Sequence, residues 1–144
     1  MKTRKVILSV ILFAVALQLQ AKDYNASMFG VKSNGTTLNT SSIQKGIDYI
    51  SENGGGRLVF YVGRYLTGTI YLRSNVTIQL EEGAILVGSV NPFDYEMNFN
   101  WTALIFALDQ TNIGITGKGV IDGQGFQVSY NLVDMINNGV VKDP

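Results

Sequence analysis

Cysteine and histidine are both absent from this chain of 144 residues. Without cysteine the chain forms no disulfides, so burial and stacking of side chains must stabilise its fold. Without histidine it lacks the side chain that most often acts as a general acid or base, which limits its chemistry. Charges balance at eleven of each sign, and no basic patch or stripe indicates a nucleic-acid partner.

The first 21 residues are typical of a secretory signal peptide. An apolar run at 6–19 follows a basic start, and Ala21 supplies a small residue at a plausible cleavage point. A membrane-spanning helix is the alternative, but it needs about 20 apolar residues and this run is shorter. We therefore expect a secreted or periplasmic protein whose mature part, residues 22–144, carries a net charge of −3. We expect no membrane span after signal removal.

Very short alternating apolar segments, separated by Gly or Asn, fill the stretch 54–88. Such runs suit a chain that turns a corner every few residues and stacks each coil on the one before it. We therefore predict an all-β solenoid with strands at 57–61, 69–72, 76–80, 84–87, 103–108, 112–116 and 119–121. The alternation predicts that five side chains face the core: Leu58, Phe60, Val76, Ile78 and Leu80.

A single amphipathic helix is predicted ahead of the coils, capped by Thr40 or Ser41 and running to about Ser51. Its apolar face carries Ile43, Ile47 and Ile50, and the glycines after Asn53 end it. Such a helix can cover the open end of the first coil, which would otherwise expose apolar side chains and strand edges. Before it, residues 29–31 form a short strand candidate.

A weak internal repeat relates Ser74-Asn75-Val76-Thr77-Ile78 to Thr111-Asn112-Ile113-Gly114-Ile115. The 22 residues from Asn53 to Asn75 suit one coil, whereas the 37 from Asn75 to Asn112 indicate an insertion. Residues 91–101 fit that insertion and carry four aromatic residues: Phe93, Tyr95, Phe99 and Trp101. These rings either form a wall of a sugar-binding groove or cover a gap in the solenoid, and we favour the cover.

Three segments occur in a specific order. The first is Phe29-Gly30-Val31 followed by the helix at 40–50. The second is 54–89, with its triple glycine and its Tyr-x-Thr-Gly, Ser-Asn-Val and Glu-x-Gly-Ala patterns. The third is 112–125, which ends in Ile-Asp-Gly-Gln-Gly. Together they resemble glycoside hydrolase family 28, the polygalacturonase family, from about Tyr24 to the last residue. The resemblance implies a right-handed parallel β-helix and inverting hydrolysis of galacturonan linkages in pectin by several Asp residues.

The family's catalytic residues lie in Asn-Thr-Asp, Asp-Asp, Gly-His-Gly and Arg-Ile-Lys motifs, and none of these occurs here. Asn39-Thr40, for example, is followed by Ser41. We therefore assign no catalytic, cofactor-binding or metal residue and expect this chain alone to be inactive. Its last residues, 135–144, are loop-like with no closing cap, so we expect a truncated N-terminal portion. Its open last coil could self-associate.

Other acids could in principle supply a catalytic pair, which for inversion needs carboxyl groups about 6.5–9.5 Å apart. Adjacent Glu81 and Glu82 beside Gly83 more plausibly flank a solvated corner. Asp94 and Glu96 lie in the irregular insertion, and Asp122 precedes Gly123 as in a turn. Arg57, Arg64 and Arg73 could bind substrate carboxylates, but isolated arginines are more often surface charges, and we assign them no role.

Two other classes of protein remain open. A non-catalytic solenoid would bind polysaccharide or build a surface fibre. A pectate-lyase-type enzyme would need Ca²⁺ held by clustered carboxylates, and no such cluster is visible in the sequence. Saturable pectin binding would distinguish the first, and unsaturated products the second.

Overall fold

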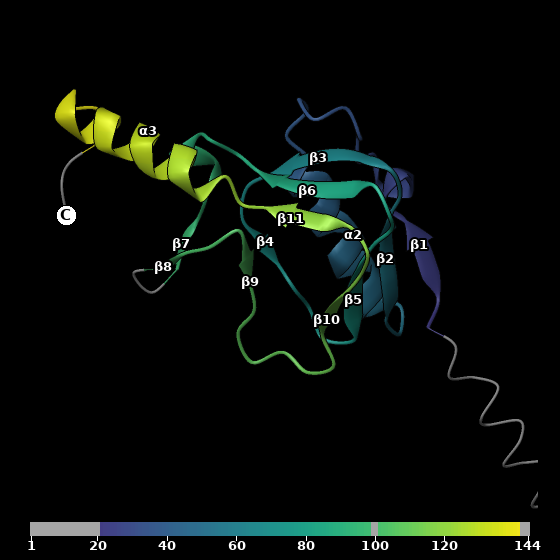
Figure 1. Ribbon diagram of the computed structural model, residues 1–144. Coiled ribbons are helices and arrows are strands. Elements are labelled where there is room, and N and C mark those ends of the chain that lie inside the picture. Colours follow the sequence, from purple (N-terminus) through teal and green to yellow (C-terminus); the bar gives the residue numbers. More distant parts are fainter. Residues whose placement is uncertain (1–20, 99–100, 142–144) are drawn as a thin grey trace, which may run out of the picture.

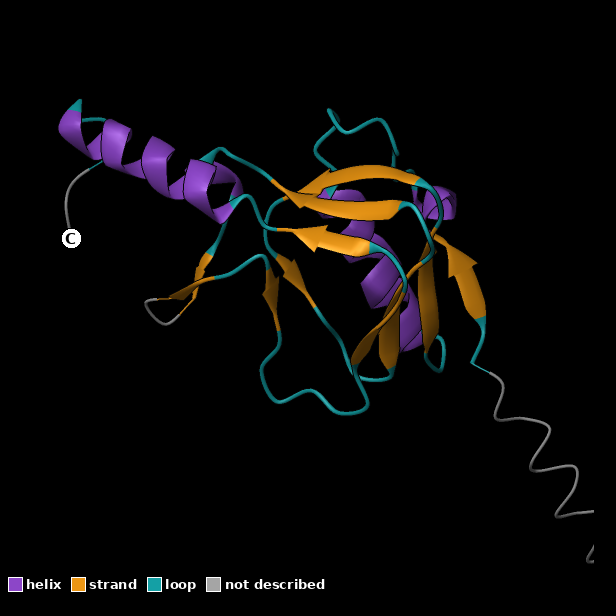
Figure 2. Ribbon diagram, viewed as in Figure 1, coloured by secondary structure: helices purple, strands orange, loops and turns teal. Residues whose placement is uncertain are grey.

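The computed structural model describes residues 21–98 and 101–141 (Figures 1 and 2). The predicted signal peptide therefore lies almost entirely outside the described residues. Parallel strands stack in coils, and a helix lies across one end of the stack. None of the described helices has the length and hydropathy of a bilayer-spanning segment.

Each coil contributes strands to different faces of the stack. The first face holds β1 (Asp23–Asn25), β2 (Gly56–Phe60), β5 (Val76–Leu80) and β10 (Gly114–Gly117), in the spatial order β1-β2-β5-β10. The second holds β3 (Gly63–Thr67), β6 (Ala84–Gly88) and β11 (Val120–Asp122), and the third pairs β4 (Ile70–Tyr71) with β9 (Ile105–Phe106). Every pairing on these faces is parallel, which confirms the predicted parallel β-helix.

The strand register stacks apolar side chains of successive coils above one another, in columns. Leu58 pairs with Ile78, and Ile78 with Ile115, while Tyr65, Leu86 and Ile121 form a second column. The five side chains predicted to face the core are buried. Strand β3 was not predicted, although Tyr65 and Thr67 alternate with half-buried Leu66. A threonine inside the core weakens the apolar alternation that a sequence pattern relies on.

Helix α2 (Thr40–Glu52) confirms the predicted cap, with Ile43, Ile47 and Ile50 fully buried. The predicted capping residue is wrong, because Asn39 rather than Thr40 or Ser41 occupies the N-cap position. The Asn39 side chain makes no capping hydrogen bond. The Asn39 amide instead bonds both backbone groups of Lys32, at 2.8 and 2.9 Å, and so closes the preceding loop. The Thr40 hydroxyl accepts a 2.8 Å hydrogen bond from the backbone N–H of Gly68.

Two other predicted segments differ from the structure. Residues 29–31 do not form a strand, because η1 (Ala26–Phe29) turns the chain there and Gly30 has φ +86°. The Asn25 side chain accepts from the N–H of Ser27 at 2.9 Å, which starts that turn.

At the other end of the chain, α3 (Gly125–Asn137) includes the first part of the region predicted to be loop-like. Apolar Val128, Leu132 and Met135 recur at helical spacing, a signal that the sequence contained.

The second coil contains the insertion. Gly56 pairs with Val76, 20 residues later, whereas Thr77 pairs with Gly114, 37 residues later. The extra chain forms η2 (Pro92–Asp94) and an antiparallel pair of β7 (Met97–Asn98) with β8 (Trp101–Thr102). The predicted insertion is confirmed, and α3 leaves the coils beside it and extends outward (Figure 1).

The third coil is covered much less than the first two. Ile115 and Ile121 each expose 42% of their surface, whereas Ile78 and Leu86 directly beneath them are fully buried. No side chain of helix α3 is fully buried. The interior columns therefore reach the outer surface of the stack at β10 and β11.

Candidate functional site

Two glycines let the insertion lie against the coils. A Cβ on Gly68 would lie 1.7 Å from the carbonyl oxygen of Asp94, and one on Gly88 would lie 2.7 Å from the Tyr95 hydroxyl. Real Cβ atoms do not approach other atoms so closely. Any side chain at either position would displace the insertion.

Hydrogen bonds then hold the insertion in place. The Ser89 hydroxyl donates to the Asp94 carboxylate, and the Tyr95 hydroxyl donates to the Ser89 carbonyl at 2.6 Å. The Thr69 hydroxyl accepts from the N–H of Glu96 at 3.0 Å and donates to the Ala103 carbonyl at 2.7 Å. Burial and, to a smaller degree, the charge of Asp94 raise the pKa of Tyr95 above 10.0. The insertion is thus fixed to the corner rather than held only by its ends.

The aromatic residues of the insertion divide into two kinds. Tyr95 is half-buried over Gly88, as expected of a cover. Phe93 exposes 63% of its surface and lines a hollow, which suits the groove-wall alternative. Phe99 and the side chain of Trp101 lie outside the described residues.

A hollow of about 600 Å³ lies between the insertion and α3. Its lining is largely apolar, and the described residues that form it include Pro92, Phe93, Tyr95, Leu104, Val128 and Leu132. None of these described lining residues is charged. This hollow offers ring surfaces but no carboxyl group for acid–base chemistry.

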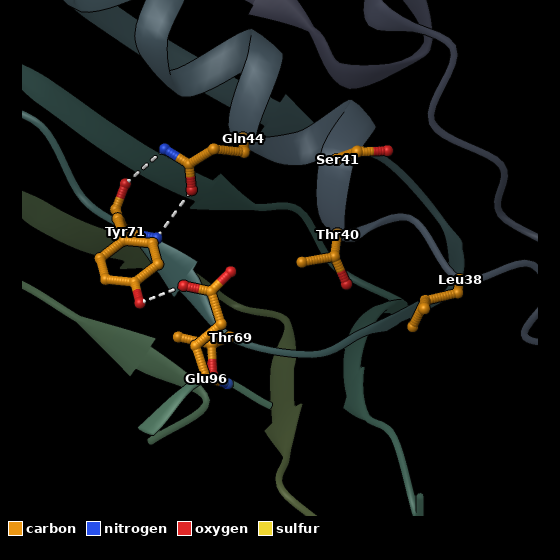
Figure 3. A pocket seen from close by; sticks show the side chains of 7 residues that line it. All are labelled: Leu38, Thr40, Ser41, Gln44, Thr69, Tyr71 and Glu96. Atoms are coloured by element: carbon orange, nitrogen blue, oxygen red, sulfur yellow. Dashed lines mark hydrogen bonds between the residues drawn. The ribbon is translucent and has the colours of Figure 1, made fainter. Parts of the chain in front are cut away.

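A second, smaller hollow of about 320 Å³ lies between the first turn of α2 and the insertion (Figure 3). Seven residues line it: Leu38, Thr40, Ser41, Gln44, Thr69, Tyr71 and Glu96. The Tyr71 hydroxyl donates to a carboxylate oxygen of Glu96 at 2.6 Å. Glu96 is the only carboxylate among these lining residues, so this hollow also lacks the pair that inverting hydrolysis needs.

The acids considered from the sequence bond different partners in the structure. Glu81 and Glu82 flank the corner between β5 and β6, as predicted, and Glu81 accepts from the Gln79 amide at 3.0 Å. Asp122 accepts from the N–H of Gln124 at 3.1 Å, which confirms its role in a turn. Among the described residues no group of three or more metal-ligating side chains lies together.

Of the arginines considered from the sequence, Arg57 and Arg73 are paired with carboxylates. Arg57 makes hydrogen bonds of 2.6 and 2.8 Å to Asp23, and this interaction raises the pKa of Arg57. The Nε of Arg73 donates to Asp48 at 2.8 Å. Arg64 lies exposed on β3. These positions agree with their interpretation as surface charges.

Sequence reasoning did not find the smaller hollow. Its walls come from the cap helix, from β4 and from the insertion, so residues 25 or more positions apart, such as Tyr71 and Glu96, meet there. An exposed glutamate in an irregular segment gives no signal of such a meeting.

Comparisons with known proteins complete the description of the site. No family model matches the chain. An exo-poly-alpha-D-galacturonosidase from Dickeya chrysanthemi is 37% identical over 134 residues, which cover 81% of this chain and 22% of that enzyme. A solved candidate glycosyl hydrolase from Parabacteroides merdae is 53% identical, with a TM-score of 0.79, over 85% of this chain and 53% of that protein.

A Family 28 exopolygalacturonase from Yersinia enterocolitica gives a TM-score of 0.66 at 37% identity, over 72% of this chain and 21% of that protein. This chain therefore spans about a fifth of the Dickeya and Yersinia enzymes. Over most of its own length it is related to the polygalacturonases of glycoside hydrolase family 28.

Proposed function

We propose that this chain forms the first coils of a secreted or periplasmic pectin-degrading glycoside hydrolase. The reaction would be inverting hydrolysis of galacturonan bonds, with its catalytic carboxylates on coils beyond those in this sequence. Galacturonan-cleaving relatives support this substrate class. The absence of the four catalytic motifs supports the placement of the chemistry elsewhere.

The exposed third coil is the observation that carries the proposal. Ile115 and Ile121 continue two buried columns, yet each remains 42% exposed. A solenoid buries its apolar interior only against neighbouring coils. A fourth coil, pairing with β10 and β11, would cover both side chains and supply the next turn of the enzyme.

In the isolated chain, a second copy would cover the same surface. Strands β10 and β11 lie at the ends of their sheets, so their outer backbone groups can pair with another chain. Between residues 113 and 123 the only charges are Lys118 and Asp122, which have opposite signs. Like-charge repulsion would therefore not keep two copies apart.

A hydrolysis assay tests whether the catalytic carboxylates lie outside this chain. The chain, incubated with polygalacturonate, should release no reducing ends above the buffer level, while a family 28 exopolygalacturonase assayed in parallel should. Hydrolysis by the chain itself, reduced by Asp122→Asn or Glu81→Gln, would contradict the proposal.

A chimera tests the family function directly. In it, this chain's coils replace the aligned region of the Dickeya enzyme. The chimera should still hydrolyse polygalacturonate, because the catalytic coils are kept and stack on equivalent β10 and β11 strands. A folded chimera without activity would show that these coils are not functionally equivalent.

Mass spectrometry of the exported chain would test cleavage after Ala21, and an intact N-terminus in the exported protein would contradict the signal-peptide assignment.

A further inference from the structure

We propose that the hollow between α2 and the insertion is a binding site for the ring of a neutral sugar. Figure 3 shows Tyr71 and Glu96 on one side of this hollow and Leu38 and Thr40 on the other. Ligand pockets usually measure about 300–1,000 Å³ and combine apolar walls with a few placed polar groups. At about 320 Å³, this hollow suits a single ring.

Most polar groups in its wall are already engaged within the protein. The Gln44 amide bonds the backbone N–H and carbonyl of Tyr71, at 2.8 and 3.0 Å. Thr69 both accepts and donates in fixing the insertion. These groups shape the wall and do not define which ligand it accepts.

Glu96 supplies the recognition chemistry. One of its carboxylate oxygens accepts from the Tyr71 hydroxyl, which fixes the orientation of the group. The other oxygen accepts no hydrogen bond from the part of the chain that the structure describes, and it points into the space beside Thr40 (Figure 3). The first turn of α2, with Thr40 and Ser41, lines the hollow as well.

A fixed, charged acceptor selects ligands by charge and by hydrogen-bond type. A carboxylate only accepts hydrogen bonds, so it pairs with hydroxyl groups, and such charge-assisted bonds are about twice as strong as neutral ones. A uronate would place a second negative charge beside Glu96. Tyr71 and Leu38, which also line the hollow, carry the apolar surface that the C–H face of a sugar would contact. The site therefore fits a neutral sugar better than a galacturonate unit.

This inference goes beyond the proposed hydrolase function and does not depend on it. The seven residues that line the hollow all lie within the part of the chain that the structure describes. Its test measures binding, so the presence or absence of polygalacturonate hydrolysis leaves the result unaffected.

Two matched probes test the proposal on the full chain by saturation-transfer difference NMR. Methyl α-D-galactopyranoside and methyl α-D-galactopyranosiduronate differ only at C6, where a neutral hydroxymethyl group replaces a carboxylate. The neutral probe should bind saturably with a Kd on the order of 1 mM, as expected for a ligand of this size. The uronate should bind at least about tenfold more weakly because of repulsion by Glu96.

Glu96→Gln keeps the shape of the side chain and removes its charge. This variant should bind the neutral probe about tenfold more weakly, and the difference between the two probes should shrink. Glu82→Gln removes an exposed carboxylate outside the hollow and should behave as the wild type. Circular dichroism establishes that both variants are folded. The proposal would be overturned if the neutral probe did not bind saturably. It would also be overturned if the two probes bound with equal affinity, or if Glu96→Gln and Glu82→Gln bound them equally well.

Discussion

The side-chain amide of Gln44 forms two hydrogen bonds with the backbone of Tyr71. The Tyr71 N–H donates to Gln44 Oε1 at 2.8 Å, and Gln44 Nε2 donates to the Tyr71 carbonyl at 3.0 Å. Strand β4 pairs with β9 on one side, and Gln44 takes the place of a neighbouring strand on the other. Asp48 accepts from the same Nε2 at 2.9 Å and so helps to orient the amide. The cap helix thus satisfies a strand edge as well as covering the core.

Replacement of Gln44 by Ala should therefore destabilise the fold. The Tyr71 N–H and carbonyl each lose a hydrogen bond, and such a bond typically contributes about 0.5–1.5 kcal/mol to stability. Urea unfolding measures the change. Gln127→Ala is the matched control, because Gln127 is exposed on α3 and its side-chain amide donates to Asn131 in the same helix, at 2.9 Å. Equal losses for the two variants would contradict the role assigned to Gln44.

Gly46→Ala should destabilise the protein although alanine favours helices by about 1 kcal/mol over glycine. A Cβ at this position would lie 2.9 Å from the Phe29 ring and 3.1 Å from a Leu58 methyl. Such overpacking typically costs about 1–3 kcal/mol. The control is Gly125→Ala at the start of α3, where a Cβ would meet nothing within 4 Å. A higher melting temperature for Gly46→Ala would show that α2 can shift outward freely.

Replacement of isoleucine by alanine should cost more stability in the second coil than at the paired position in the third coil. Ile78→Ala removes a fully buried side chain and should cost about 2–5 kcal/mol. Ile115, which pairs directly with Ile78, is 42% exposed, so Ile115→Ala should cost about 1 kcal/mol or less. Denaturant unfolding of both variants measures the difference. Equal costs would mean that the third coil is covered in solution.

Charged residues on the open coil should reduce self-association. The double variant Ile115→Lys, Ile121→Lys places positive charges on β10 and β11, where the pairing of two copies would bring like charges together. Sedimentation velocity should show a smaller mean particle mass than for the wild type. Val62→Lys, at the exposed corner between β2 and β3, should leave the particle mass unchanged. Wild-type chain that remains monomeric at high concentration would contradict the prediction.

Stability should fall as the pH rises above 10. Burial raises the pKa of Tyr95, so the folded protein retains a proton that the unfolded chain releases from about pH 10 upward. The stability contributed by this group is complete below pH 10 and is lost as the pH approaches the raised pKa. Tyr95→Phe should be less stable than the wild type at pH 7, because the bond to Ser89 is lost, and this difference should shrink at pH 11. A constant difference would contradict the assignment.

The sequence alone predicted some elements of the fold correctly and missed others. The glycine-punctuated alternation around Leu58 and Ile78 predicted the coils, and the spacing of Ile43, Ile47 and Ile50 predicted α2. Strand β3 was not predicted because Thr67 is a buried polar residue, whose hydroxyl donates to the adjacent Gly68 carbonyl at 3.2 Å. The strand expected at 29–31 was wrong because a side-chain bond from Asn25 starts a turn there.

The sequence by itself determined the periodic core, since burial of alternating residues depends only on neighbours along the strand and on the register of short coils. Tertiary structure decided which polar groups meet. Gln44 and Tyr71 are 27 positions apart, and Tyr71 and Glu96 are 25 positions apart. Their contacts depend on where the insertion folds back and on how the cap helix lies across the first coil. No local pattern records those positions, because they follow from the packing of whole elements against one another.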